Sequence, residues 1–268
     1  MAQTARHDAW QAGDSYDQYM GRWSRQVAPQ FLDWLNLPGG LDWLDIGCGT
    51  GALSAAIVAR CNPKSLFSID PSEGFLAQAQ ANVPDRRVTF QVADAQALPL
   101  GAASKDVVVS ALVLNFVGDK QQALTEMKRV GRVGGSIGFY VWDYPGGGVE
   151  FMHAFWRAAT ALDPAAADLT EDKRFPFCTR EGLIDLVRSA GLTSVDLTSI
   201  EVATVFGDFE DYWRPFTLGA GPAPGYCVSL APEARQRLKQ SLQEDLPARA
   251  DGSIHLKARA LAVRARSD

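Results

Sequence analysis

The sequence predicts an α/β fold built on a Rossmann-like sheet of seven mostly parallel strands, with helices on both faces and a small helical cap. Two observations carry this prediction. Short apolar runs alternate with helical stretches from residue 41 to residue 142, which is typical of right-handed βαβ crossovers. Residues 44–51 read LDIGCGTG between the first apolar run and the first helix. Such a corner presents backbone N–H groups and a helix N-terminus to a polar or nucleotide-like ligand.

Length and composition narrow the classes of protein further. The chain has 268 residues, 47% of them hydrophobic, which suits one large domain or a core domain with an inserted cap. A net charge of −5 argues against a general basic surface for nucleic acid or anionic membranes. Four scattered cysteines without a CxxC pair favour a reduced, cytoplasmic protein and no metal site. Neither an export signal nor a membrane span is expected, since no apolar run of ~18 residues occurs.

The nucleotide-binding core is expected between residues 41 and 142. The run at 106–110 is apolar throughout, as in a strand covered on both faces. The run at 65–70 ends on an acid and is followed by a proline, which closes a strand. With the other apolar runs they give five predicted strands, at 41–46, 65–70, 87–92, 106–110 and 135–142. Residues with helical spacing or good helix formers lie between them, at 52–59, 72–79 and 120–130.

Beyond residue 142 the alternation of strands and helices stops. Three glycines at 146–148 predict a flexible joint, and an apolar stripe on 150–162 predicts an amphipathic helix. The remaining elements are expected as a helix at 179–190, a strand at 192–205, a Pro/Gly-rich loop at 219–225, a charged helix at 232–246 and a strand at 253–264. The expected domains are an N-terminal helical lid (1–40), a core (41–142), cap insertions (143–178 and 206–250) and the rest of the core sheet (179–205 and 251–268).

The glycine spacing leaves the ligand open. Gly47, Gly49 and Ala52 satisfy the dinucleotide pattern G-x-G-x-x-[GA], and Gly51 completes G-x-G-x-G equally well. Asp45 is more informative, because a carboxylate facing the loop would repel a pyrophosphate and favour an ammonium or sulfonium group. The alternative is that Asp45 only ties down the loop through backbone N–H groups.

The run D-x-G-x-G-x-G at 45–51 resembles motif I of the class I S-adenosylmethionine methyltransferases. Residues 94–100, DAQALPL, resemble the "DA…LP" segment of the ubiquinone/menaquinone-biosynthesis group, methyltransferase type 11. The resemblance covers residues 41–142 specifically and 179–264 by pattern. It implies a seven-stranded sheet whose last strand is antiparallel, and S-adenosylmethionine as cofactor with S-adenosylhomocysteine as product.

The resemblance also implies the cofactor site. The Asp70 carboxylate would accept ribose hydroxyls, although it could instead cap the following helix. Asp94 would accept from the adenine amine, and the Ala95 N–H would donate to a ring nitrogen. An N-terminal lid would bring Tyr19 and Arg22 to the methionine carboxylate. The alternative is an ordinary amphipathic helix that packs Tyr16, Met20 and Trp23 on the core. The expected cofactor residues are Asp45, Gly47, Cys48, Gly49, Gly51, Asp70, Pro71, Asp94, Ala95, Ser110, Tyr19 and Arg22.

The acceptor side is less well defined by the sequence. Asp143 is the expected base, and Asn115 stands where many relatives carry a His, so it can orient a substrate oxygen but cannot act as a base. Aromatic residues outside the core predict a small, apolar or aromatic acceptor, although they could simply fasten the cap. The expected substrate residues are Trp23, Trp142, Tyr144, His153, Trp156 and Tyr212.

These observations predict an enzyme that moves a methyl group from S-adenosylmethionine to a small molecule by in-line displacement. It is expected to be a monomer or homodimer without nucleic-acid partners. The sequence leaves open whether O, N, C or S is methylated. One alternative is an NAD-dependent oxidoreductase, whose Tyr-x-x-x-Lys pattern is absent. The other is a methyltransferase-like protein that binds S-adenosylmethionine without catalysis.

Overall fold

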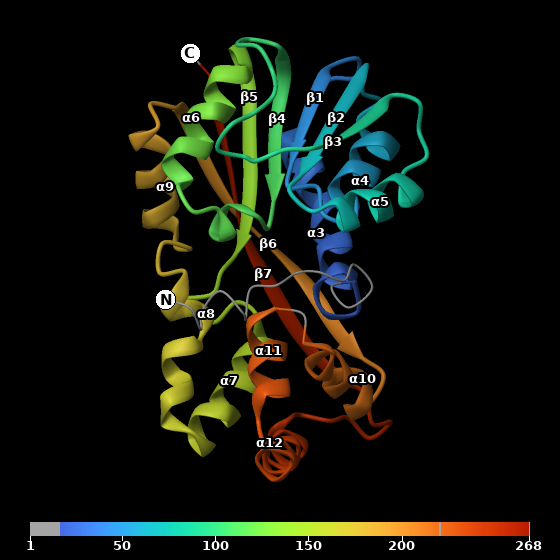
Figure 1. The fold of residues 1–268 in the computed structure, drawn as a ribbon, viewed down its shortest axis with the longest axis vertical. Coiled ribbons are helices and arrows are strands. Elements are labelled where there is room, and N and C mark those ends of the chain that lie inside the picture. The colour runs from blue at the N-terminus through green and yellow to red at the C-terminus, as the bar shows by residue number, and fades with distance from the viewer. Residues whose placement is uncertain (1–16, 220, 268) are drawn as a thin grey trace. The chain divides into compact units, whose positions relative to one another are not determined.

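A computed structural model describes residues 17–219 and 221–267, and the chain falls into two compact units (Figure 1). The sheet unit comprises residues 24–142, 177–200 and 260–268. The helical unit comprises the chain up to Trp23, together with residues 143–176 and 201–259. Residues 1–16 of the predicted N-terminal lid lie outside the described residues.

The sheet has seven strands in the order β3-β2-β1-β4-β5-β7-β6. Neighbouring strands from β3 to β5 are parallel, and β5 and β7 are antiparallel. The predicted Rossmann-like sheet is therefore confirmed, including its antiparallel last strand. Strand order reverses between β1 and β4, which is where open α/β sheets bind ligands. The strands are β1 (Asp42–Ile46), β2 (Ser65–Asp70), β3 (Val88–Val92), β4 (Lys105–Ala111), β5 (Gly131–Trp142), β6 (Thr193–Phe206) and β7 (Ile254–Arg266).

Helices pack against this sheet in the places that its connections require. Helices α4 and α5 contact β2, and α6 contacts β4 and β5 (Figure 1). Right-handed crossovers leading outward in opposite directions from β1 and β4 place these two groups of helices on opposite faces. The helices are α3 (Arg22–Leu35), α4 (Ala52–Arg60), α5 (Glu73–Asn82), α6 (Lys120–Val130) and α9 (Arg180–Ser189).

The C-terminal half of α3 lies against β5 because β5 carries a glycine at the contact. A Cβ at Gly138 would lie 3.0 Å from the Phe31 ring and 3.2 Å from Leu35. The Phe31 ring also meets Tyr140 edge-on, with ring centroids 4.9 Å apart. Phe31 is fully buried, so this contact contributes roughly 1.5–3 kcal/mol by apolar burial.

The helical unit contains mostly short helices. One prediction is wrong here, because the expected loop at 219–225 becomes helical from Pro222. Pro222 occupies the first turn of its helix, where no intrahelical N–H bond is lost and the fixed φ favours helix. The helices of the helical unit are η1 (Asp17–Gly21), α7 (Glu150–Leu162), η3 (Pro164–Leu169), α8 (Glu171–Arg174), α10 (Phe209–Trp213), η4 (Arg214–Leu218), α11 (Pro222–Ser229) and α12 (Pro232–Asp245).

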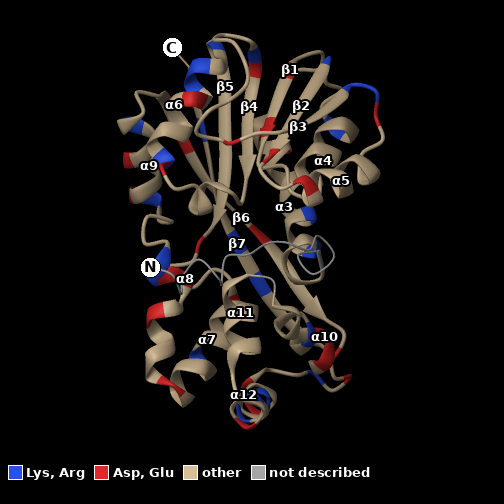
Figure 2. Cartoon of the chain, viewed as in Figure 1, with Lys and Arg blue, Asp and Glu red and all other residues tan. Residues whose placement is uncertain are grey.

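Charged residues of both signs are interspersed along the two units (Figure 2). Within residues 17–219 and 221–267, no helix is both long and apolar enough to cross a membrane. In the same described ranges, no group of His, Cys, Asp and Glu side chains is arranged to hold a metal ion.

A buried cluster of three polar side chains joins β1, β2 and α4 at the glycine loop. The Ser54 hydroxyl donates to Oδ2 of Asp45 at 2.7 Å and lies 2.9 Å from the Ser68 hydroxyl. All three side chains are fully buried. Asp45 is thus tied to the first turn of α4 by a side-chain hydroxyl, while its Oδ1 has no partner among the described residues. Burial, together with the nearby Asp70 charge, raises the pKa of Asp45 to about 7.

This raised pKa makes a prediction about stability. Between the unfolded pKa of ~4 and the folded pKa of about 7, the folded state binds more protons than the unfolded state. The free energy of unfolding therefore falls as pH rises through this window, by up to roughly 4 kcal/mol. Urea unfolding at pH 5 and pH 8 should show that the free energy of unfolding of Asp45→Asn depends less on pH than that of the wild type.

The variant must be compared with the wild type, because burial also raises the pKa of Glu171 to about 7. The contribution of Glu171 to the pH dependence of unfolding is the same in the variant and in the wild type. Asp185→Asn, an exposed change on α9, should retain the wild-type pH dependence. An unchanged slope in Asp45→Asn would show that Asp45 is ionised throughout this range.

Candidate functional site

The loop from β1 to α4 is closely packed at both ends and open in the middle. A Cβ at Gly47 would lie 2.5 Å from Val113, and one at Gly51 would lie 3.0 Å from Val83. Both glycines have a positive φ, as does Gly49. Among the described residues, apart from its two chain neighbours, no heavy atom lies within 4 Å of a Cβ built at Gly49. The backbone at Gly49 therefore borders open space, where a ligand can approach it closely.

The Asp70 carboxylate lies beside this open loop. Its Oδ2 accepts a hydrogen bond from the Gly49 N–H at 3.0 Å, and its Oδ1 accepts from the Ser72 N–H at 2.9 Å. Helix α5 is capped by the Ser72 hydroxyl, so the alternative that Asp70 caps it is wrong. Burial raises the pKa of Asp70, although the two N–H bonds oppose this shift. Each oxygen retains a lone pair for a ribose hydroxyl.

Two other expected cofactor residues form the floor of the loop. The Cys48 N–H donates to the Ile69 carbonyl at 2.9 Å, and its thiol is buried with Leu76 and Ala79. Burial raises the pKa of the Cys48 thiol far above its usual value, so it fills space as a neutral group. The Ser110 hydroxyl donates to the Ile46 carbonyl at 2.9 Å and fastens β4 to β1. Pro71, next to Asp70, is exposed.

The expected adenine segment follows β3. Asp94 is exposed, and its Oδ1 accepts from the Gln96 backbone N–H at 2.8 Å. The Gln96 Oε1 in turn accepts from the Asp119 N–H at 2.8 Å. These bonds orient the Asp94 carboxylate at the carboxyl end of β3, with Ala95 half-buried beside it.

Sequence reasoning missed two apolar residues at the same edge. Val92 ends β3 with 48% of its surface exposed, and Phe116 follows β4 with 37% exposed. Exposed apolar side chains at the carboxyl ends of strands suit the faces of a planar base. Val92 ends a predicted strand, and Phe116 lies shortly after another, which is a signal that could have identified them.

Asn115 lies on the short helix η2 (Leu114–Phe116), directly after β4. It is 3% exposed, and its Nδ2 has no hydrogen-bond partner in the described part of the chain. Such an unpartnered buried donor needs an explanation, and a bound ligand oxygen supplies one. The orienting role of Asn115 stays a prediction, and the unpartnered amide donor supports it.

Asp143, the expected base, is engaged by other groups of the helical unit. Its carboxylate accepts from Nε of Arg259 at 2.7 Å and from the Gly146 N–H at 2.9 Å. These bonds hold the turn that precedes α7 against β7. The catalytic role of Asp143 stays a prediction, and these contacts are those of a structural carboxylate.

The two expected lid residues belong to the helical unit. The Arg22 guanidinium makes two hydrogen bonds to the Asp211 carboxylate, at 2.7 and 3.0 Å. Tyr19 is 2% exposed and its hydroxyl has no partner in the described part of the chain. Tyr19 packs edge-on against Phe216, with centroids 5.3 Å apart. Cofactor binding by Tyr19 and Arg22 stays a prediction.

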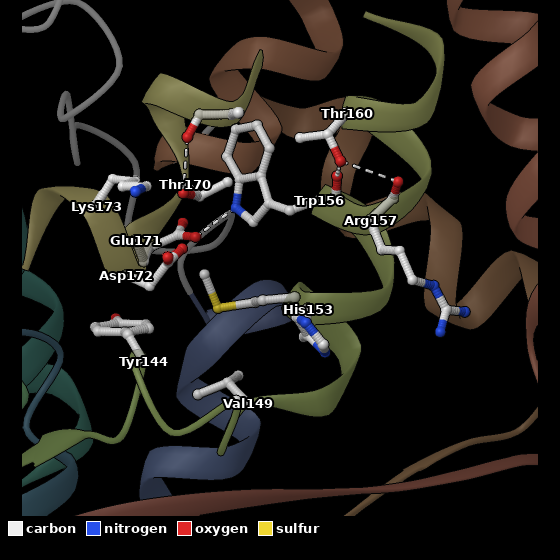
Figure 3. A pocket seen from close by; sticks show the side chains of 13 residues that line it. Tyr144, Val149, His153, Trp156, Arg157, Thr160, Thr170, Glu171, Asp172 and Lys173 are labelled. Carbon is white, nitrogen blue, oxygen red and sulfur yellow. Dashed lines mark hydrogen bonds between the residues drawn. The ribbon is translucent and has the colours of Figure 1, made fainter. Parts of the chain in front are cut away.

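The structure brings part of the expected substrate set together. Tyr144, His153 and Trp156 line one cavity of about 310 Å³ in the helical unit (Figure 3). Sequence reasoning missed Glu171, which lines the same cavity, because it lies on a single-turn helix with no sequence pattern.

The other three expected substrate residues lie elsewhere. Trp23 packs against Phe206, with centroids 5.2 Å apart. The Tyr212 hydroxyl donates to the Phe151 carbonyl at 2.8 Å. Trp142 is 2% exposed, at the end of β5 in the sheet unit. None of the three lines the cavity.

Comparison with known proteins gives the family of the central segment. Residues 44–139 match the family described as "Methyltransferase domain". A malonyl-[acyl-carrier protein] O-methyltransferase of Methylovorus is 36% identical over 117 residues, or 40% of this chain and 39% of that protein. The chain thus matches well under two thirds of the length of this curated relative.

Solved structures with a similar fold cover most of the chain. A candidate methyltransferase of Bacillus halodurans has a TM-score of 0.62 at 15% identity, covering 90% of this chain and 99% of that one. Phosphoethanolamine N-methyltransferase 2 of Haemonchus contortus, solved with S-adenosyl-L-methionine, has a TM-score of 0.56 at 16% identity, covering 95% and 60%. The matched segment is thus a methyltransferase domain, and the fold of the chain is the Rossmann-like fold of these methyltransferase structures.

Proposed function

We propose that this chain transfers the methyl group of S-adenosylmethionine to a small-molecule acceptor by in-line displacement and leaves S-adenosylhomocysteine. The observation that carries the proposal is the open backbone at Gly49, which is hydrogen-bonded to the Asp70 carboxylate. A loop that is open where a ligand approaches, beside a buried ribose-type acceptor, is what this cofactor requires. The matched methyltransferase segment includes both residues.

In this proposal each residue has a limited task, because bound S-adenosylmethionine itself supplies an electrophilic methyl group on a sulfonium. Asp70 accepts from the ribose hydroxyls, and Asp94 and Ala95 bind the adenine edge. Asn115 donates to an acceptor oxygen from its Nδ2, which has no partner among the described residues. Orientation of this kind can supply ~7–11 kcal/mol of barrier reduction.

Two classes of acceptor deserve a test. One is a small apolar or aromatic molecule, favoured by Tyr144 and Trp156 in the wall of the cavity. The other is a carboxylate on a malonyl thioester, favoured by the name of the Methylovorus relative. We favour the first class, because the cavity wall contains the carboxyl groups of Glu171 and Asp172, which disfavour an anionic ligand. Cytoplasmic location and a monomeric or dimeric state remain predictions.

Calorimetry on Asp70→Ala tests the cofactor assignment. Loss of the hydrogen bonds that two ribose hydroxyls donate to the charged carboxylate should weaken S-adenosylmethionine and S-adenosylhomocysteine binding at least ~10-fold. Asp185→Ala, an exposed change on α9, should bind both as the wild type does. If the wild type bound NADH and neither S-adenosyl compound, the oxidoreductase alternative would replace the proposal.

Mass spectrometry of acceptor pools tests the reaction. Incubation with S-adenosylmethionine should methylate a member of a phenol and hydroxyarene pool and leave a malonyl thioester unchanged. With that acceptor, Asn115→Ala should lower kcat/KM about 10-fold through loss of one orienting hydrogen bond, while affinity for S-adenosylhomocysteine stays constant. Methylation of the malonyl thioester alone would reverse the choice of acceptor. Tight S-adenosylmethionine binding without turnover in either pool would favour the non-catalytic alternative.

A further inference from the structure

The cavity of about 310 Å³ lies wholly within the helical unit, between the turn after β5, helix α7 and residues 167–173. Val149, Met152 and the rings of Tyr144 and Trp156 supply an apolar wall (Figure 3). This volume is at the lower end of the range for small-molecule sites, ~300–1,000 Å³. It has room for a single substituted ring.

The Glu171 carboxyl group belongs to the wall of this cavity. Its residue is only 4% exposed, and its Oε2 accepts a hydrogen bond from Nε1 of Trp156 (Figure 3). Its Oε1 has no partner in the described part of the chain. A buried acceptor without a partner costs about 1–3 kcal/mol, more when it is charged. Native proteins rarely retain such a group unless a ligand or water satisfies it.

The surroundings of Glu171 keep its carboxyl group basic near neutral pH. Burial is the largest influence and raises its pKa to about 7, against the opposing effects of its own backbone N–H, the Trp156 indole and the Arg174 charge. The Asp172 charge contributes a smaller upward shift. The buried Tyr19 phenol lies close enough that the Glu171 charge contributes to raising the pKa of Tyr19. The Tyr19 hydroxyl also lacks a partner among the described residues. Two unpartnered buried polar atoms thus occur close together in this unit.

The cavity wall also indicates which ligands are excluded. Glu171 and Asp172 both line it, so a carboxylate would meet two acidic groups there. The basic groups of the wall are Lys173, His153 and Arg157, and Arg157 pairs with Asp245 at 3.8 Å. Oε1 of Glu171 is a buried acceptor without a donor in the described part of the chain.

We propose that this cavity binds a small neutral molecule with a ring-sized apolar body and a hydroxyl group that donates a hydrogen bond to Oε1 of Glu171. The ring lies against Trp156 and Met152 in the apolar wall. The proposal goes beyond the proposed function, because it concerns binding alone and holds whether or not a methyl group is transferred. Where the proposed function also holds, it describes the class of acceptor.

The test uses the full chain labelled with ¹⁵N and three probes that differ in one substituent. They are 4-methylphenol, 4-methylanisole, which lacks the donor, and the anion 4-methylbenzoate. The readout is the indole N–H resonance of Trp156, identified by its loss in Trp156→Phe. At pH 8, 4-methylphenol should bind at least ~10-fold tighter than 4-methylanisole, because only the phenol satisfies the carboxylate. The benzoate should bind more weakly than either.

Glu171→Gln tests the role of the carboxylate. The oxygen of the glutamine amide accepts from Trp156, and its NH₂ group presents a donor to the cavity. The preference for the phenol over the anisole should therefore largely disappear. Glu233→Gln, an exposed change on α12, should retain it. Equal binding of phenol and anisole to the wild type, no phenol binding, or an unchanged preference in Glu171→Gln would each overturn the proposal.

The wild-type series alone decides the matter if Glu171→Gln does not fold. Calorimetry with S-adenosylmethionine on the same sample separates this proposal from the proposed function. Phenol binding without S-adenosylmethionine binding would refute only the proposed function. S-adenosylmethionine binding without phenol binding would refute only the cavity assignment.

Discussion

The glycine loop is held in shape by two carboxylates on neighbouring strands, and the ligand-binding edge depends on this arrangement. Asp45 bonds to Ser54 in the first turn of α4, while Asp70 bonds to the Gly49 N–H in the middle of the loop. Both carboxylates are buried, and burial raises the pKa of each. The protein therefore bears the cost of two desolvated acids within one corner. In return, the open backbone at Gly49 has a fixed position without a bound ligand.

The helical unit follows a different principle. Its interior is held together by aromatic rings, such as Phe155 stacked on Phe216 with centroids 4.4 Å apart. Ring packing of this kind leaves little need for polar contacts. The Glu171 carboxyl group lies inside that interior, buried with one oxygen that has no partner among the described residues. An energetic cost that packing does not explain is the usual mark of a binding position.

Much of the fold was predictable because apolar periodicity is a strong signal in a parallel sheet. Strands β2 and β3 and helices α6 and α7 lie within a residue or two of their predicted bounds. The segment at 219–225 misled because prolines and glycines usually mark loops, whereas Pro222 here starts a helix.

Residues of the site could be predicted where they lie at or directly after the carboxyl end of a predicted strand. Asp70 and Asp94 carry that signal. The hydrogen bond between Ser54 and Asp45 depends on how a strand and a helix pack. No local sequence pattern predicts that packing. Glu171 lies on a single helical turn, so its burial follows from tertiary structure alone.

The order of strands in the sheet has a consequence for how this chain is made. Strand β7 lies between β5 and β6, although β6 comes about fifty residues before β7 in the chain. During synthesis β6 must therefore wait, with an unpaired edge, until β7 emerges and fills the gap. Such waiting strands are templates for pairing with other chains. The edge of β6 is thus open to such pairing until β7 has been synthesised, although strands β1 to β5 can fold before that.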